Sequence, residues 1–427
     1  MSIGIFLVLC LVVFLLVGLP IAFSLGLTAV SYFFYTDNLR YLIVLAQRTF
    51  NGINSFELIA IPLFILAGDL MYEGKISQAL VNLAKSLAGS VRGSMAIIAT
   101  LACMFFGAVS GSGPATTSAI SSVMAKGMKE DGYPPVFSAC SVAAAGPLGS
   151  LIPPSITMVV YGVTTNTSVG ELLLAGVWPG VVFGLCLMVY EFYICKKYSY
   201  GTIIPFSLNS LAKNFFISIP ALVTPVIILG GIYSGMFTPT EAGGSAVFYA
   251  LLVGMFWSKT VKVKDLPRIL LTSGVAAATI IIIIGNVSCL SFVLTREQIP
   301  ERLAAMAVQN LSAPWQFLLV VNIIYIFAGM IENGSSAIVM LAPILHPIAL
   351  KFGIDPVFFG AMTVANLAIG MITPPMAASL YIAGRIFDVE MPDIIKGIIP
   401  FFYVMLVGLL IVCLTAPMVT WLPNVLL

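Results

Sequence analysis

The sequence predicts an all-α polytopic membrane protein made of two inverted repeats, each with a re-entrant helical hairpin and a broken helix. Three observations support this fold class: an apolar composition, an internal repeat rich in Gly and Pro, and an uneven distribution of Lys and Arg. Of the 427 residues, 60% are hydrophobic and only 8% are charged, whereas a soluble domain has about 25% charged residues. A water-soluble fold cannot cover that much apolar surface, so nearly the whole chain is expected to lie in a bilayer.

Long apolar segments recur from end to end. They include residues 3–17, 216–233, 270–287 and 401–412. Because a helix of about 20 residues spans the hydrocarbon core, the pattern predicts about ten full crossings. The first segment has no basic start and no obvious small-residue cleavage site, and further apolar segments follow at once. It is therefore expected to be a spanning helix rather than a signal peptide.

Charge and cysteine content exclude several classes of function. The net charge is +2 and no basic stripe marks a soluble face, so no nucleic-acid partner is expected. The seven cysteines are scattered without a C-x-x-C pair, which is typical of packing residues. With His346 as the single histidine, neither an H-E-x-x-H zinc site nor a Cys/His metal cluster can be built. No organic cofactor is expected.

An internal repeat organises the chain. Residues 113–179 match residues 334–400 without a gap, at the offset of 221 residues that separates Pro153 from Pro374. Most identities are Gly or Pro, which fix breaks and turns of the backbone. They include Gly113/Gly334, Gly132/Gly353, Pro135/Pro356, Gly149/Gly370, Pro154/Pro375, Gly176/Gly397 and Pro179/Pro400. The two halves therefore share a backbone plan.

The repeat predicts five parts in order. Residues 1–92 hold the first membrane helices of repeat 1 and, at 76–92, an amphipathic surface helix, and residues 93–180 hold its hairpin and broken helix. Residues 181–312 hold a polar linker, the matching membrane helices of repeat 2 and a second surface helix at 297–312. Residues 313–400 hold the second hairpin and broken helix, and residues 401–427 form a C-terminal membrane helix. The hairpin tips are predicted at 110–114 and 333–336.

Basic residues predict the orientation. If the segment 126–133 at the base of the first hairpin is cytoplasmic, so are Lys196, Lys197 and the basic loop 259–268. This topology places about 14 Lys and Arg in the cytoplasm and about 5 outside, as the positive-inside rule requires. The hairpins then enter from opposite faces of the membrane, and both termini lie on the side away from the cytoplasm.

The two helix breaks, at 149–154 and 370–375, carry the predicted chemistry. An irregular backbone in hydrocarbon costs several kcal/mol for each unpaired polar group, so it needs a use. Proline leaves carbonyl oxygens free for a hard cation such as Na⁺, and the exposed helix N-termini suit a carboxylate. A single Gly-x-x-x-x-Pro motif is more often a simple kink. Its duplication beside hairpin tips rich in Ser, Thr and Asn favours a functional site.

Ionisable residues in or beside apolar segments are further candidates. For Glu241, bracing of a helix end is favoured over a functional role. Asn366 is expected to hydrogen-bond across helices or to face a ligand, and His346 to be a satisfied hairpin histidine. The other candidates are Arg48, Glu57, Asp69 and Glu332.

At these motifs the sequence resembles the large membrane subunit of the tripartite ATP-independent periplasmic (TRAP) transporters. The likeness covers essentially the whole chain. It rests on Arg48-x-Phe50-x-Gly52-x-x-Ser55-Phe56 and on segments 60–68, 107–112, 152–155, 235–242 and 370–375.

The resemblance implies an elevator-type carrier that couples Na⁺ to the uptake of a small organic acid. A transport core (93–180 and 313–400) would move against a scaffold. The implied sodium ligands are Ser110, Ser112, Gly113, Gly149, Ile152 and Pro154 for one ion, and Gly334, Gly370, Thr373 and Met376 for the other. The substrate is expected near Ser150, Asn333, Ser335 and Asn366. The implied partners are a separate small membrane subunit (Q) and a periplasmic substrate-binding protein (P).

Two other function classes remain as alternatives. An intramembrane hydrolase would need a base beside Ser110 or Ser112, but His346 belongs to the other hairpin. Hairpins that enter from both faces are more typical of a carrier with alternating access than of a passive channel. The identity of the acid stays open among C4-dicarboxylates, sialic acid, other sugar acids and keto acids.

Overall fold

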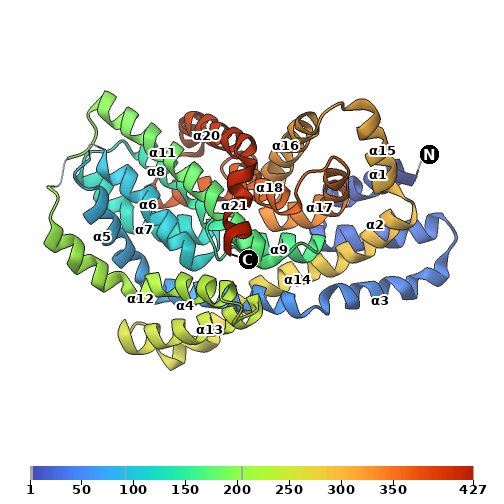
Figure 1. Ribbon diagram of the computed structural model, residues 1–427, viewed down its shortest axis with the longest axis horizontal. Coiled ribbons are helices and arrows are strands. Elements are labelled where there is room, and N and C mark those ends of the chain that lie inside the picture. Colours follow the sequence, from blue (N-terminus) through green and yellow to red (C-terminus); the bar gives the residue numbers. More distant parts are fainter. Residues whose placement is uncertain (1–2, 92, 203–204, 427) are drawn as a thin grey trace.

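The computed structural model describes residues 3–91, 93–202 and 205–426, and this part of the chain is built from helices joined by short turns (Figure 1). Residues 1–2, 92, 203–204 and 427, which belong to the predicted parts 1–92, 181–312 and 401–427, lie outside the described residues. Repeat 1 begins with α1 (Ile3–Leu16), α2 (Ile21–Tyr35), α3 (Leu42–Ile53), α4 (Ala60–Glu73) and α5 (Ile76–Ala88). The matching part of repeat 2 holds α12 (Leu208–Tyr233), α13 (Pro239–Leu252), α14 (Leu266–Arg296) and α15 (Ile299–Asn310).

Each repeat then forms a hairpin and a broken helix. The first hairpin is α6 (Ser94–Ser110) with α7 (Gly113–Glu130), followed by α8 (Pro135–Ala145), a tight turn at Gly146–Ser150 and α9 (Ile156–Thr165). The second is α16 (Pro314–Ile331) with α17 (Gly334–Lys351), followed by α18 (Pro356–Gly370) and α19 (Ala378–Phe387). The repeats end with α10 (Val169–Ala175) and α11 (Val177–Tyr198), and with α20 (Met391–Leu414) and α21 (Ala416–Leu426). We call the hairpins and broken helices the core, and α2, α3, α4, α13 and α14 the scaffold.

The number of long spans is smaller than predicted. Among the described residues, six helices are long and apolar enough to cross a membrane, or seven if α3 and the segment Phe56–Glu73, which are bent by 58° at a short break, count as one span. The prediction of about ten crossings counted each broken helix and the first apolar segment as spans and left out the hairpins, whereas the six long helices include both arms of the second hairpin, Pro314–Ile331 and Gly334–Lys351. In the structure α8, α9, α18 and α19 are separate half-helices, and α1 and α2 have only 14 and 15 residues.

The hairpins enter the core from opposite ends. Helix α7 runs from the tip of the first hairpin to the base of that hairpin, and α8 returns from the base to the break. Helix α9 follows the break and therefore runs away from the base of the first hairpin. Helix α17 runs beside α9 in the same direction: Thr157 and Gly334, near the helix starts, line one cavity, and further along Tyr161 Oη is 2.8 Å from His346 Nδ1. The base of the second hairpin therefore lies opposite that of the first. In Figure 1 the two hairpins flank α9 and α18 from the left and the right.

The hairpin arms pack directly against the breaks. A Cβ on Gly107 of α6 would lie 2.6 Å from Gly149 Cα, and a Cβ on Gly370 would lie 2.5 Å from Gly329 Cα in α16. Only glycine permits backbones to approach so closely. The same contact in both repeats shows that the shared sequence plan builds the same packing twice.

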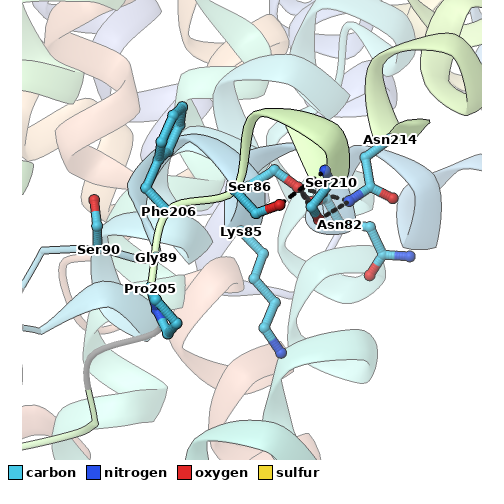
Figure 2. A pocket seen from close by; sticks show the side chains of 10 residues that line it. Asn82, Lys85, Ser86, Gly89, Ser90, Pro205, Phe206, Ser210 and Asn214 are labelled. Atoms are coloured by element: carbon cyan, nitrogen blue, oxygen red, sulfur yellow. Dashed lines mark hydrogen bonds between the residues drawn. The ribbon is translucent and has the colours of Figure 1, made fainter. Parts of the chain in front are cut away.

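The two predicted surface helices are α5 and α15. Helix α5 buries one apolar face, which includes Leu80 and Ala84. Its polar side is joined to α12, since Asn214 Nδ2 donates to Ser86 Oγ at 2.6 Å and Ser86 Oγ lies 3.5 Å from Ser210 Oγ (Figure 2). These bonds fasten the surface helix of repeat 1 to the first long helix of repeat 2.

Candidate functional site

A cavity with a volume of about 430 Å³ lies where the two hairpin tips meet the scaffold. We call it the central cavity. Seven of the fourteen predicted site residues line it, and all seven belong to the core: Ser110, Ser112, Gly113, Ser150, Asn333, Gly334 and Ser335. Its scaffold wall comes from α4 and α14. The structure thus brings together tips that are more than 200 residues apart in the chain.

The first tip and the first break form a compact group of oxygen atoms. Ser110 Oγ is 2.9 Å from Thr116 Oγ1, and the carbonyl oxygen of Gly111 accepts a hydrogen bond from the Ile156 amide at 3.3 Å. Gly111 has a φ of +64°, and a Cβ there would lie 2.4 Å from the carbonyl oxygen of Pro154, so only glycine fits. Ser110 and Pro154 are buried. This arrangement can offer hydroxyl and carbonyl oxygens to a cation away from water.

The second break is more open. Thr373 Oγ1 donates to the carbonyl oxygen of Ile369 at 2.8 Å, and the Thr373 amide donates to the carbonyl oxygen of Gly370 at 3.0 Å. The Met376 amide donates to Met330 of α16 at 2.9 Å, which ties the break to its hairpin. Met376 is 50% exposed. The peptide bonds Pro153-Pro154 and Pro374-Pro375 are both cis.

The oxygen atoms described at the two breaks belong to uncharged hydroxyl and carbonyl groups. Among the described residues, no group of three or more His, Cys, Asp and Glu is placed to hold a metal ion. A monovalent, hard cation accepts carbonyl and hydroxyl ligands, which is the donor set that the breaks provide.

The central cavity is suited to an anion with hydroxyl groups. The N-termini of α7, α9 and α17 border it, and such helix ends carry a partial positive charge. No Lys, Arg or His is among the described residues that line it. Asp69 of α4 is the one carboxylate in its wall, and this group accepts a hydrogen bond from Ser273 Oγ at 2.5 Å.

The other seven predicted residues lie outside this lining. Gly149 and Gly370 pack behind the tips as described above. Asn366 is fully buried and donates to Asn322 Oδ1 of α16 at 2.7 Å, so it makes the cross-helix contact that was one of its two predicted roles. Its own Oδ1 has no partner among the described residues. The remaining four are Ile152, Pro154, Thr373 and Met376.

Some residues in and beside the lining were missed by sequence reasoning. The Thr116 hydroxyl is hydrogen-bonded to that of Ser110. Thr157 lies two residues after Ser155, the N-cap residue of α9, and lines the central cavity. Their hydroxyls follow the tip and the break closely in sequence, which was a usable signal. Thr272 and Thr279 of α14 had none, because they come from a scaffold helix whose contact with the core is purely tertiary.

Two structural roles predicted from the sequence are confirmed. Glu241 braces the start of α13, since its carboxylate accepts a hydrogen bond from the Thr238 amide at 2.8 Å and Thr238 Oγ1 caps the Glu241 amide. His346 is buried and bonded to Tyr161, as a satisfied histidine should be.

Comparison with protein families supplies an independent view. Residues 8–418 match the model described as "Tripartite ATP-independent periplasmic transporter, DctM component". The YdaH transporter of Alcanivorax borkumensis has a similar fold, with a TM-score of 0.62 at 15% identity, covering 90% of this chain and 88% of that one.

Curated relatives are similar over nearly the whole chain. The C4-dicarboxylate TRAP transporter large permease protein DctM of Pseudomonas aeruginosa is 40% identical over 403 residues, with 94% of each chain covered. The sialic acid TRAP transporter large permease protein SiaM of Vibrio cholerae is 35% identical, with 97% of this chain and 96% of the relative covered. The isethionate TRAP transporter permease protein DctMQ of Oleidesulfovibrio alaskensis is 39% identical, and this chain covers 63% of it. These relatives are named as transporter permeases and not as enzymes.

Proposed function

The chain belongs to the DctM component family of the tripartite ATP-independent periplasmic transporters, and from this premise we propose that it drives sodium-coupled uptake of a small organic acid across the bacterial inner membrane. Family membership and the apolar helices establish a multi-pass membrane transporter subunit. The observation that carries the proposal is the central cavity, where two re-entrant tips and three helix N-termini meet hydroxyl groups. This chemistry suits a carboxylate and, at the two breaks, a sodium ion.

The arrangement of core and scaffold supports an elevator mechanism. The seven predicted site residues that line the cavity all belong to the core, whereas α4 and α14 only close the cavity from one side. Movement of the core past these two helices would carry ligands bound at the tips from one face of the membrane to the other. Sodium bound at the breaks would order the tips and so favour substrate binding, which is the coupling step.

The proposed partners are a small membrane subunit (Q) and a periplasmic binding protein (P). The tripartite family description implies three components. The candidate substrates include a C4-dicarboxylate and sialic acid, as named for the relatives, and the other sugar acids and keto acids. In the proposed orientation the basic loops are cytoplasmic and both termini lie in the periplasm, as the positive-inside rule favours.

Reconstitution tests the proposal. Proteoliposomes that hold this chain with its small subunit should accumulate labelled acid against its gradient only when the binding protein and an inward sodium gradient are both present. The same liposomes without the binding protein are the control. Equilibration to equal concentrations without dependence on sodium would indicate a channel, and full saturable uptake by this chain alone would exclude the tripartite assembly.

A further inference from the structure

We propose that a second cavity along the boundary between scaffold and core is a transit site for the substrate, with Arg48 as the residue that binds its carboxylate group. This inference rests on the proposed function as an organic-acid carrier. The cavity has a volume of about 450 Å³ and lies between α3 and α14 of the scaffold and α9 and α17 of the core. We call it the seam cavity.

The seam cavity continues the central cavity along the same helices. On α14 the central cavity is lined by residues between 272 and 280, and the seam cavity by residues between 284 and 295. On α9 and α17 the lining likewise moves from the N-terminal end to later turns: from 156–157 to 163–166, and from 334–335 to 339–343. The two cavities therefore follow one another along a single boundary between core and scaffold.

Arg48 makes the seam cavity different from the central cavity. Its guanidinium carbon lies 4.9 Å from the centroid of the Phe292 ring, which also lines the cavity. The ion pairs among the described residues are Lys126–Glu130 and Arg268–Glu73, so Arg48 has no carboxylate partner there. Stacking on an aromatic ring fixes the planar group while its N–H donors remain available. Such a fork matches the two oxygens of a carboxylate.

The other lining groups suit the rest of a hydroxylated acid. Amide and hydroxyl side chains come from both walls of the cavity: Asn51, Ser55, Thr164, Asn166, Ser288 and Ser291. Glu57 is the one acidic residue in the lining, and it can accept hydrogen bonds from hydroxyl or amide groups. The ligand chemistry that fits is a small carboxylate that carries several hydroxyl or amide groups.

Charged thiol reagents measure the proposed anion preference without any transport. In a cysteine-free variant assembled with the small subunit in vesicles, Ser291→Cys would be modified by a negatively charged sulfonate methanethiosulfonate and by a positively charged trimethylammonium one. Arg48→Gln should lower the ratio of the sulfonate rate to the trimethylammonium rate about tenfold, because loss of a nearby positive charge slows the negatively charged reagent and speeds the positively charged one. Glu57→Gln should raise the ratio. Arg302→Gln, an exposed arginine of α15 outside the lining, is the matched control and should leave it unchanged.

Protection by acids tests the site itself. At millimolar concentration, D-gluconate or N-acetylneuraminate should slow modification of the Ser291→Cys variant severalfold and more than succinate, which carries no hydroxyl or amide group, and Arg48→Gln should abolish that protection. The proposal is overturned if Arg48→Gln leaves the ratio of the two rates unchanged, or if none of the three acids protects the cysteine. Protection without any sodium-driven uptake would refute the proposed transport function while the seam cavity remained an acid-binding site.

Discussion

At the scale of single residues, hydroxyl groups at the helix breaks are central to the proposed coupling. The Thr373 hydroxyl donates a hydrogen bond to the carbonyl oxygen of Ile369, so the lone pairs of the hydroxyl oxygen remain free for a cation. The resemblance to the TRAP family implied Thr373 as a ligand. Thr116 and Thr157 were missed although they follow the tip and the break closely in sequence, because no helical period continues through a break to show which side chains face the site.

Replacement of Thr373 by Val tests the second sodium site. The change keeps the shape of the side chain and removes one oxygen, so loss of a charged-group contact should cost about 1.5–3 kcal/mol. Since 1.4 kcal/mol is a factor of ten, the sodium concentration for half-maximal uptake should rise about 10- to 100-fold. Initial uptake rates across a sodium titration give the measurement.

The matched control is Thr36→Val. Thr36 Oγ1 also donates to a carbonyl one turn earlier, that of Tyr32 at 2.9 Å, but it lies at the end of α2. This variant should keep the sodium midpoint of the wild type. An unchanged midpoint for Thr373→Val would show that the hydroxyl only caps a half-helix.

At the scale of the elements, the contact between each hairpin arm and its break holds the core together. The offset of 221 residues identified Gly149 and Gly370 as equivalent. It did not identify the glycines that contact them, Gly107 and Gly329. These two are 222 residues apart and not 221, and each meets its break only through helix packing. Hairpins, breaks and surface helices were thus predictable from Gly, Pro and polarity, whereas the lining from α4 and α14 depends on how helices pack.

A methyl group at Gly370 should disrupt this contact. A Cβ there would lie 2.5 Å from Gly329 Cα, so α16 must move away from the break. We expect Gly370→Ala to destabilise the protein by about 1–3 kcal/mol, the usual cost of overpacking, and to lower the melting temperature of the purified complex.

Gly230→Ala provides the comparison. Gly230 lies within α12, and a Cβ there meets no atom within 4 Å. The same chemical change should therefore leave the melting temperature equal or slightly higher, because alanine favours helix. Equal melting temperatures for the two variants would mean that the close approach at Gly370 does not constrain the core.

At the scale of the whole molecule, the inverted arrangement follows from the order of the elements and from the pairing of α9 with α17. The sequence predicted inversion from charge, and the structure supports it from helix direction, which is an independent argument. Orientation in the membrane itself remains a prediction, because helix packing does not distinguish one side of the membrane from the other.

Accessibility to a membrane-impermeant thiol reagent tests that orientation. In a cysteine-free background, Lys196→Cys and Lys262→Cys should resist the reagent in intact cells, because the positive-inside rule places both sites in the cytoplasm. Lys351→Cys, at the base of the second hairpin, should react. All three should react after the membrane is permeabilised, and the opposite pattern in intact cells would reverse the assigned topology.

The shortness of α2 has a consequence for the surrounding lipid. With 15 residues this helix is about 22.5 Å long at 1.5 Å per residue, against a hydrocarbon thickness of about 30 Å. Its outward residues, such as Phe23 at 52% and Phe34 at 61% exposure, are apolar. Acyl chains beside this corner must compress or tilt, at a cost of a fraction of a kcal/mol for each ångström of mismatch. The protein should therefore partition into thinner regions of a membrane and be more stable in lipids with shorter tails.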